Sequence, residues 1–287
     1  MQIKNSVFLV TGGASDPYGR ATVEALLKDG ARVIICDLPT KDLHIYGDEK
    51  AIFLPIDASQ EEDMKTLISV IQDKYGKLDG IVNCIDHYKE IDVTKKEPPS
   101  MREFAEIVHE NVLGPFNIAR FLIPLLSRNI PKKNGGRGII INMSSAAAFE
   151  GPKGGCAYAA SKAAVIRMTE ALSLDLQGVQ IKCLSIITNY KVDDAKTING
   201  LGGCFELKGT NGEVVDAIGD EPRRFAQLVK KVIESSAIND ATLRLEKFAD
   251  ALSVPPPCPP IGFGAWDRMK QFLMRESRSD RHPAAID

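Results

Sequence analysis

Short apolar runs alternate with helical patterns along the first two thirds of this chain, and that alternation constrains the fold more than any other feature. The runs lack a polar residue at every second position, which is typical of strands buried on both faces of a parallel sheet. They lie at residues 7–10, 32–36, 51–54, 80–83, 138–142 and 181–186. Strand and helix alternate at least five times, so the sequence predicts an α/β fold, a doubly wound parallel sheet flanked by helices with right-handed crossovers.

Two of the connecting helices can be placed from their own patterns. Residues Glu61–Tyr75 carry apolar side chains on one helix face, and Ser59 with Glu62 forms a predicted capping box at its start. A longer helix is predicted over about residues 100–126, interrupted or kinked near Gly114-Pro115 and near Pro124 because proline disturbs a helix interior.

The composition and periodicity of the sequence change after the last apolar run. Residues 188–222 are rich in glycine and poorly periodic, which indicates a loop over a pocket that would select the substrate. Residues 255–260 read PPPCPP and exclude regular structure there. We therefore predict a single domain over residues 1–253 and a proline-rich C-terminal extension over residues 254–287.

Charge and hydropathy exclude two classes of partner. The net charge is −2 and lysines and arginines form no long run, so we expect no direct contact with nucleic acid. No apolar run approaches the roughly 18 residues that a membrane span needs, so we expect a soluble protein without a membrane span.

Cysteine and histidine are scattered. The 6 cysteines form no CxxC pair, which indicates a reducing compartment and no disulfide framework. The 4 histidines show no metal-ligand spacing, so we expect no metal site. The first strand begins within a few residues of Met1 and leaves no room for a signal peptide, so we expect a cytoplasmic protein.

A glycine-containing loop, residues 11–20 with the sequence TGGASDPYGR, follows the first predicted strand and opens a helix. Glycines such as Gly12 and Gly19 allow backbone N–H groups and the helix dipole to approach a pyrophosphate. Asp37 ends the second strand, where a carboxylate accepts hydrogen bonds from a ribose 2′-hydroxyl and repels a 2′-phosphate. The combination predicts a Rossmann-type sheet that binds NAD in preference to NADP.

A second motif lies on the helix that begins near Tyr158. Tyr158 and Lys162 are four residues apart and therefore share one helix face. A tyrosine has a pKa of about 10, and a neighbouring ammonium group lowers that pKa by favouring the phenolate. Ser145 follows the strand at residues 138–142 and can hydrogen-bond a carbonyl or alcohol oxygen. Together the three residues predict proton transfer coupled to hydride transfer at a secondary alcohol or ketone.

These motifs together resemble the short-chain dehydrogenase/reductase superfamily over about residues 3–245. The stretches that carry the resemblance are VTGGAS at 10–15, DLP at 37–39, VNC at 82–84, GIIIN at 138–142, AAFEG at 147–151 and YAASK at 158–162. The resemblance implies a dehydrogenase acting on a hydroxyacyl-CoA, a hydroxysteroid or a similar secondary alcohol, and a homodimer or homotetramer formed through the helices that carry Asn111 and Tyr158.

The resemblance also implies a role for each matching residue. Tyr158 would exchange the proton, Lys162 would lower its pKa and hold the nicotinamide ribose, Ser145 would polarise the substrate oxygen, and Asn111 would support a proton-relay water. The residues implied to bind the dinucleotide are Gly12, Ser15, Gly19, Asp37, Asp57, Ala58, Cys84, Tyr158, Lys162 and Thr188.

The chain departs from the family pattern at four places. Asp16-Pro17-Tyr18 replaces a Gly-Leu pair in the glycine loop, and a carboxylate facing a pyrophosphate is unfavourable unless it points away. Ile85-Asp86 replaces the Ala-Gly after the fourth strand, Thr188-Asn189 replaces a Pro-Gly after the sixth, and Glu246-Lys247 replaces an Asp-Gly near the C-terminus.

Two hypotheses follow from these observations. The first is an NAD(H)-dependent oxidoreductase that interconverts a secondary alcohol and a ketone with Tyr158 as acid and base. The alternative is a catalytically weak or inactive dehydrogenase-like protein that binds or scaffolds a partner. The departures at Asp16, Ile85-Asp86 and Thr188-Asn189 favour it. A mitochondrial matrix location is the alternative to the cytoplasm, because a similar member of the family is mitochondrial.

Overall fold

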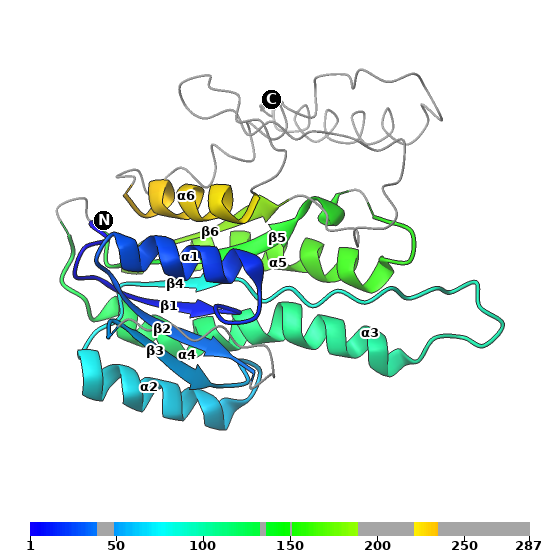
Figure 1. Cartoon of the computed structure of the whole chain (residues 1–287), viewed down its shortest axis with the longest axis horizontal. Helices are drawn as coiled ribbons and strands as arrows, with labels where there is room; N and C mark the ends of the chain where they lie inside the picture. Colours follow the sequence, from blue (N-terminus) through cyan, green and yellow to red (C-terminus); the bar gives the residue numbers. More distant parts are fainter. Residues whose placement is uncertain (39–48, 133–135, 150, 189–220, 235–287) are drawn as a thin grey trace, which may run out of the picture. The chain divides into compact units, whose positions relative to one another are not determined.

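Six parallel strands form one sheet in the described part of the chain, as the apolar runs predict (Figure 1). The sheet order is β3-β2-β1-β4-β5-β6, so the order reverses between β1 and β4. The strands are β1 (Val7–Thr11), β2 (Arg32–Asp37), β3 (Ala51–Pro55), β4 (Gly80–Asn83), β5 (Gly138–Ser145) and β6 (Ile181–Thr188). The predicted doubly wound α/β class is confirmed, and ligands bind such sheets outside the carboxyl ends of the strands at the reversal.

The computed structural model describes residues 1–38, 49–132, 136–149, 151–188 and 221–234. All of these belong to a unit that spans Met1–Leu245, and a second unit spans Glu246–Asp287. Most of the predicted substrate loop, the domain end near residue 253 and the proline-rich extension lie outside the described residues, so these remain predictions.

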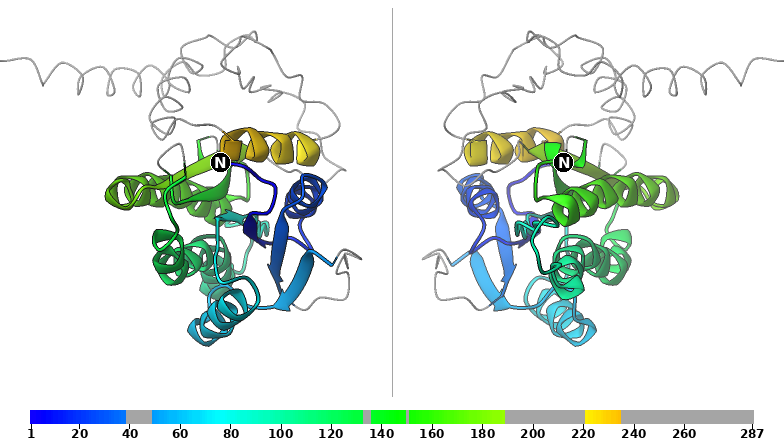
Figure 2. Two further views of the ribbon diagram at one scale, coloured as in Figure 1. Left: turned by 90° about the vertical axis from the view of Figure 1, so that its left-hand side faces the viewer. Right: turned by 90° about the vertical axis from the view of Figure 1, so that its right-hand side faces the viewer.

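Helices cover both faces of the sheet, and each face is closed by its own apolar layer (Figure 2). One layer joins β1 and β2 to α1 (Pro17–Lys28) and α6 (Glu221–Glu234), where Tyr18 packs edge-on against Phe225. The other joins the same strands to α2 (Glu61–Tyr75), α4 (Gly114–Ser127) and the C-terminal end of α5 (Cys156–Asp175). No described helix is both long enough and apolar enough to span a bilayer.

The predicted interruption of the long helix near Gly114-Pro115 is a π-helical turn, whereas α4 continues through Pro124 to Ser127. Helix α3 (Met101–Val108) passes into the turn η1 (His109–Leu113), and α4 begins directly after it at Gly114. Such turns widen a helix by one residue and occur often at functional sites. Here the turn carries Asn111, which is 1% exposed, toward the carboxyl end of the sheet.

The predicted capping box at the start of α2 is wrong. The residue before the helix is Gln60, whose side chain makes no capping bond. Ser59 instead donates its N–H and its hydroxyl to the Asp57 carboxylate, at 2.9 and 2.6 Å. The Asp63 carboxylate accepts from the Asp57 N–H at 2.8 Å. The Ser59 hydroxyl that a capping box requires is therefore bonded to Asp57 instead. The acidic residues in the first turn of α2 are stabilised by the helix dipole.

Candidate active site

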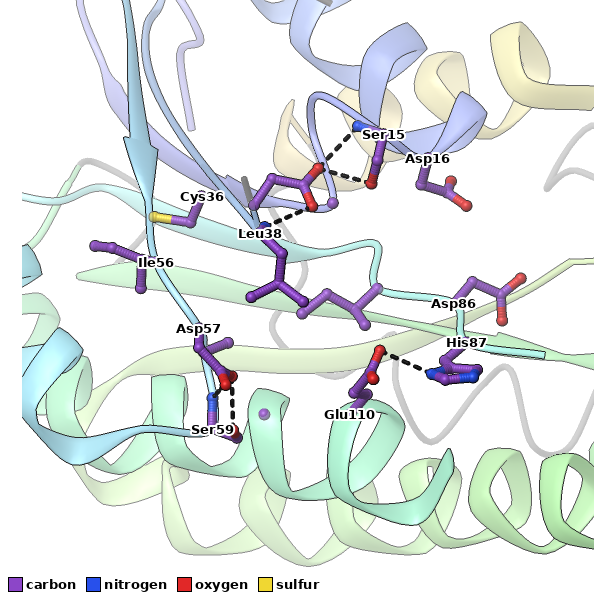
Figure 3. A pocket seen from close by; sticks show the side chains of 15 residues that line it. Ser15, Asp16, Cys36, Leu38, Ile56, Asp57, Ser59, Asp86, His87 and Glu110 are labelled. Carbon is purple, nitrogen blue, oxygen red and sulfur yellow. Dashed lines mark hydrogen bonds and ion pairs between the residues drawn. The ribbon is translucent and has the colours of Figure 1, made fainter. Parts of the chain in front are cut away.

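A cleft of about 320 Å³ opens at the carboxyl ends of β1, β2, β3 and β4 (Figure 3). It holds acidic side chains from five segments but, among the described residues that line it, no lysine or arginine. Its lining residues are Gly12, Ser15, Asp16, Cys36, Asp37, Leu38, Ile56, Asp57, Ala58, Ser59, Ile85, Asp86, His87, Glu110 and Gly114.

The predicted dinucleotide residues divide between this cleft and its walls. Gly12, Ser15, Asp37, Asp57 and Ala58 line the cleft. The others do not line it and lie in the surrounding structure; they are Gly19, Cys84, Tyr158, Lys162 and Thr188. About half of the residues predicted to bind the dinucleotide therefore line the cleft.

The glycine loop packs tightly on the end of the sheet. Gly12 has φ +67°, and a Cβ atom there would lie 2.9 Å from the carbonyl oxygen of Cys84. A Cβ atom on Gly19 would overlap the carbonyl oxygen of Gly12. Glycine is required at both positions so that the loop and the start of α1 can approach β4. The Cys84 thiol below them is buried, and burial followed by the charge of Asp16 raises its pKa well above the ordinary value.

Asp16 caps the N-terminus of α1. Its carboxylate accepts from the N–H groups of Tyr18 at 2.8 Å and Gly19 at 3.3 Å. These are backbone donors of the helix start that would otherwise be available to an anion. The inserted carboxylate is thus stabilised by the helix end, which accounts for its presence in a loop where a bound pyrophosphate would repel it.

Asp37 bonds the same loop from the end of β2. Its Oδ2 atom accepts from the N–H groups of Ala14 and Ser15, at 3.0 and 2.8 Å, and from the Ser15 hydroxyl at 2.8 Å. Its Oδ1 atom accepts from the N–H of Leu38 at 3.0 Å. A carboxylate oxygen has room for about two donors, so Oδ1 keeps capacity for a ribose hydroxyl while Oδ2 is saturated.

Tyr158, Lys162 and Asp86 form a buried group beside the cleft. The Tyr158 hydroxyl donates to Oδ1 of Asp86 at 2.9 Å, and Nζ of Lys162 lies 2.8 Å from the same oxygen. Nζ also donates to the carbonyl of Ile85 at 3.4 Å. The side chains of Lys162 and Asp86 are 1% and 4% exposed, and Tyr158 is 2% exposed, so solvent screens this group weakly.

The pKa of Tyr158 is raised, which is opposite to the direction that the sequence predicted. Burial raises that pKa most, the Asp86 charge raises it further, and a hydrogen bond from Ser145 acts in the lowering direction. The prediction relied on the ammonium group of Lys162 acting alone. In the structure burial favours the neutral phenol, and Asp86 balances the ammonium group that would otherwise oppose this effect.

Asn111 ties the π-helical turn to the segment after β4. Its side chain accepts from the His87 N–H at 2.8 Å and donates to the His87 carbonyl at 2.9 Å. It also donates to the Ser161 hydroxyl on α5 at 2.9 Å. Asn111 thereby fixes the backbone next to Asp86 and connects it to the helix that carries Tyr158 and Lys162.

The cleft contains one pair that the sequence did not suggest. Nδ1 of His87 lies 2.9 Å from Oε2 of Glu110 (Figure 3). The two residues are 23 positions apart and belong to no motif, so only the folded structure shows that they meet.

Thr188, predicted to bind the dinucleotide, lies at the end of β6 and is buried. Its hydroxyl donates to the Ser144 carbonyl at 3.0 Å.

The family model described as short chain dehydrogenase matches residues 6–194. The chain belongs to the short-chain dehydrogenase family. It is therefore an oxidoreductase, as the motifs at Ser145, Tyr158 and Lys162 implied. Members of this family act on small-molecule substrates and generally use NAD or NADP.

Named relatives agree with this assignment. The chain is 35% identical over 252 residues to 3-hydroxyacyl-CoA dehydrogenase type-2 of Drosophila melanogaster, covering 85% of this chain and 97% of that protein. It is 31% identical over 250 residues to the protein of the same name from Homo sapiens, with 85% and 95% covered. Within the family, the quoted motifs resemble those of 3-hydroxyacyl-CoA dehydrogenase type II, and these relatives agree with that resemblance.

A solved structure shares the fold. The crystal structure of 3-hydroxyacyl-CoA dehydrogenase type-2 from Mycobacterium avium superposes with a TM-score of 0.67 at 23% identity, over 83% of this chain and 93% of that one. At this identity the likeness concerns the fold alone.

Proposed function

We propose that this short-chain dehydrogenase is an NAD(H)-dependent enzyme that interconverts a secondary alcohol and a ketone, with Tyr158 as the acid and base. The observation that carries the proposal is the buried Tyr158 hydroxyl, which lies beside Lys162 and Ser145 next to a cleft at the sheet reversal. Buried tyrosine and lysine side chains are costly unless they are paired, so their presence together indicates a functional site.

The preference for NAD over NADP rests on charge. Asp37 ends β2 and keeps one carboxylate oxygen able to accept a ribose hydroxyl. A 2′-phosphate in the same place would face the carboxylate, and the described lining of the cleft offers it no lysine or arginine. A cationic partner is the usual means of holding that phosphate.

The described residues fit a dinucleotide at its adenosine end more readily than elsewhere. Gly12, Ser15 and Asp37 line the cleft there. The N–H groups at the start of α1 are bonded to Asp16, and Tyr158 and Lys162 are bonded to Asp86. Binding of the pyrophosphate therefore requires Asp16 to release its donors, whereas the Lys162 ammonium group has three N–H donors and can bind the nicotinamide ribose while it stays paired with Asp86.

The chain's own groups supply the proton chemistry. When bound, the nicotinamide supplies or accepts the hydride at the carbon that carries the oxygen. Tyr158 gives its hydroxyl proton to the ketone oxygen in reduction and takes the alcohol proton in oxidation. Ser145 donates a hydrogen bond to the substrate oxygen, and Lys162 stabilises negative charge on the Tyr158 oxygen.

The substrate class follows from the relatives. Two of them are named 3-hydroxyacyl-CoA dehydrogenase type-2, and a third, 30% identical over 250 residues, is the ipsdienol dehydrogenase of Ips pini. Both names describe secondary alcohols. We infer a hydroxyacyl-CoA, a hydroxysteroid or a similar secondary alcohol as substrate.

Calorimetric titration with NADH, with NADPH as the control, tests the cofactor. Micromolar binding of NADH with weaker binding of NADPH is expected, since Asp37 repels a 2′-phosphate. Failure of both to bind would mean that Asp16 and Asp86 keep the site closed, and a non-catalytic binding protein would then replace the proposal.

Replacing Tyr158 by phenylalanine tests the chemistry. The loss of the hydroxyl should reduce turnover of a secondary alcohol by about 10²–10⁴-fold, the usual contribution of a positioned acid or base. NADH affinity and the circular dichroism spectrum should remain those of the parent, because the ring still fills its buried site. Full activity in Tyr158→Phe would contradict the assignment.

A further inference from the structure

One carboxylate oxygen joins the two side chains that the proposed reaction uses. Oδ1 of Asp86 lies 2.9 Å from the Tyr158 hydroxyl and 2.8 Å from Nζ of Lys162. A single carboxylate oxygen therefore accepts the hydrogen bond of the phenol and also balances the charge of the Lys162 ammonium group. Because all three side chains are at most 4% exposed, water cannot replace either contact without a rearrangement.

This carboxylate is a property of this chain and not of the family pattern. The family has an Ala-Gly pair where this chain has Ile85-Asp86, and a glycine carries no side chain to reach the tyrosine. The backbone that carries Asp86 is held firmly, because Asn111 bonds both the N–H and the carbonyl of the next residue, His87. Asn111 thus fixes the backbone next to Asp86, while Tyr158 and Lys162 hold the Asp86 side chain.

We propose that Asp86 is a positioning residue that holds the Tyr158 hydroxyl in a hydrogen bond and, through its charge, adds to the burial that already opposes ionisation of Tyr158. The proposal rests on the proposed function and assigns to Asp86 the control of its proton step. In reduction the ketone carbon gains a hydride from the dinucleotide, and the ketone oxygen gains the proton as the Tyr158 O–H bond breaks. In oxidation the same tyrosine must first be ionised, and the charge of Asp86 opposes that ionisation.

The other groups that face Tyr158 do not replace this effect. Ser145 on β5 favours the phenolate through its hydrogen bond, and Tyr18 on α1 opposes it through a weaker electrostatic effect. Tyr88 packs edge-on against the ring at 5.3 Å, and Phe104 on α3 adds apolar surface. Lys162 on α5 is the nearest cation, but Asp86 balances its charge.

Two further carboxylates of the cleft, Glu110 and Asp16, bond groups other than the Tyr158 hydroxyl. His87 is bonded to Glu110 of the π-helical turn, at 2.9 Å between Nδ1 and Oε2. Asp16 is bonded to the N-terminus of α1. Asp86 is therefore the carboxylate that acts directly on the Tyr158 hydroxyl.

The first test is the ultraviolet titration of tyrosinate at alkaline pH, which needs neither cofactor nor substrate. The contribution of Tyr158 is obtained by subtracting the curve of Tyr158→Phe from that of each protein. In Asp86→Asn the Tyr158 transition should move to lower pH by at least about one unit, because the charge is lost while an acceptor oxygen remains. An unchanged Tyr158 curve in this variant would overturn the proposal.

Two further variants determine whether such a shift arises from the Asp86 charge itself. Asp86→Gly restores the family residue and should move the curve in the same direction, which provides a second measurement if Asp86→Asn folds poorly. Glu110→Gln removes another carboxylate of the cleft that bonds His87, and its Tyr158 curve should match that of the parent. An equal shift in Glu110→Gln would show a general charge effect and would overturn the assignment to Asp86.

The second test is the pH profile of kcat/KM for alcohol oxidation and for ketone reduction. In Asp86→Asn the acidic limb of oxidation and the alkaline limb of reduction should both move to lower pH, since both report the Tyr158 proton. Unmoved limbs in an active variant would contradict the proposal. If no protein turns over any alcohol, the proposed function fails, whereas the tyrosinate titration still decides the role of Asp86.

Discussion

Asp16, Asp37 and Asp86 follow or end three neighbouring strands, and each of them bonds donors of the chain itself. Asp16 accepts hydrogen bonds from two N–H groups of α1, and Asp37 accepts hydrogen bonds from the glycine loop. Asp86 accepts a hydrogen bond from Tyr158 and forms an ion pair with Lys162. A dinucleotide would need several of the same donors. At the scale of single residues, the affinity for the cofactor is therefore set by competition between these carboxylates and the ligand.

That competition predicts tighter NADH binding in Asp16→Gly. The substitution frees the N–H groups of Tyr18 and Gly19 and removes a charge that repels the pyrophosphate. We expect about a tenfold lower Kd, which corresponds to about 1.4 kcal/mol. Loss of the helix cap should cost only a few tenths of a kcal/mol in the free energy of unfolding.

The control for this prediction is Asp16→Asn, measured by the same calorimetric titration. An asparagine keeps a side-chain oxygen for the helix cap but carries no charge, so its NADH affinity should lie between those of the parent and Asp16→Gly. Equal affinities in all three proteins would mean that Asp16 does not compete with the pyrophosphate.

At the scale of elements, a buried carboxylate joins the start of β1 to the start of β4. Asp79 is 2% exposed and bonds Lys77, Lys132 and the N–H of Val7. Burial alone would raise its pKa, but the hydrogen bonds from Lys132, Lys77 and Val7 lower it below the ordinary value. The carboxylate is thus more acidic in the folded chain than in the unfolded chain, where its pKa is about 3.9.

The sign of that shift predicts how stability depends on pH. A lowered folded pKa contributes stability that is complete above about pH 4 and is lost as the pH falls further. Asp79→Asn should reduce the free energy of unfolding at pH 7 by about 2 kcal/mol. The difference between parent and variant should shrink below pH 4, which urea unfolding at several pH values would measure.

Glu62→Gln is the matched control for that measurement. Glu62 is 83% exposed and pairs with Lys65, so its removal should change stability by less than about 0.5 kcal/mol at any of these pH values. A parent-to-variant difference for Asp79→Asn that stays constant from pH 7 to pH 3 would contradict the assigned pKa shift.

At the scale of the whole molecule, the sheet could be predicted because buried parallel strands leave bare apolar runs in the sequence. Strand β5 nevertheless extends beyond its apolar run to Ser145, and β6 extends to Thr188. Their last residues include polar side chains such as Ser144 and Thr188, whose hydroxyls are satisfied inside the fold. Polar residues that are buried and hydrogen-bonded cannot be distinguished from loop residues by pattern alone.

The candidate site was predictable only where its spacing is local. Tyr158 and Lys162 are one helical turn apart, so their side chains are neighbours on one helix face wherever the helix packs. Asp86 lies 72 positions from Tyr158, so its contact depends on how β4 and α5 pack and on which rotamer the carboxylate adopts. The sequence identified Asp86 as a departure from the family, but its partners and the resulting direction of the Tyr158 pKa required the structure.

The sequence also predicts that the chain forms a homo-oligomer through its helices. Leu113 and Phe116 are 48% and 44% exposed on the segment that continues from Asn111, where the sequence predicts a homodimer or homotetramer interface. We expect light scattering to give a dimer or tetramer for the parent, and a shift toward monomer in Phe116→Arg. Ile130→Arg changes a side chain that is 87% exposed beyond α4 and should keep the parental mass. A monomeric parent at micromolar concentration would contradict this prediction, since burying both side chains is what would stabilise the association.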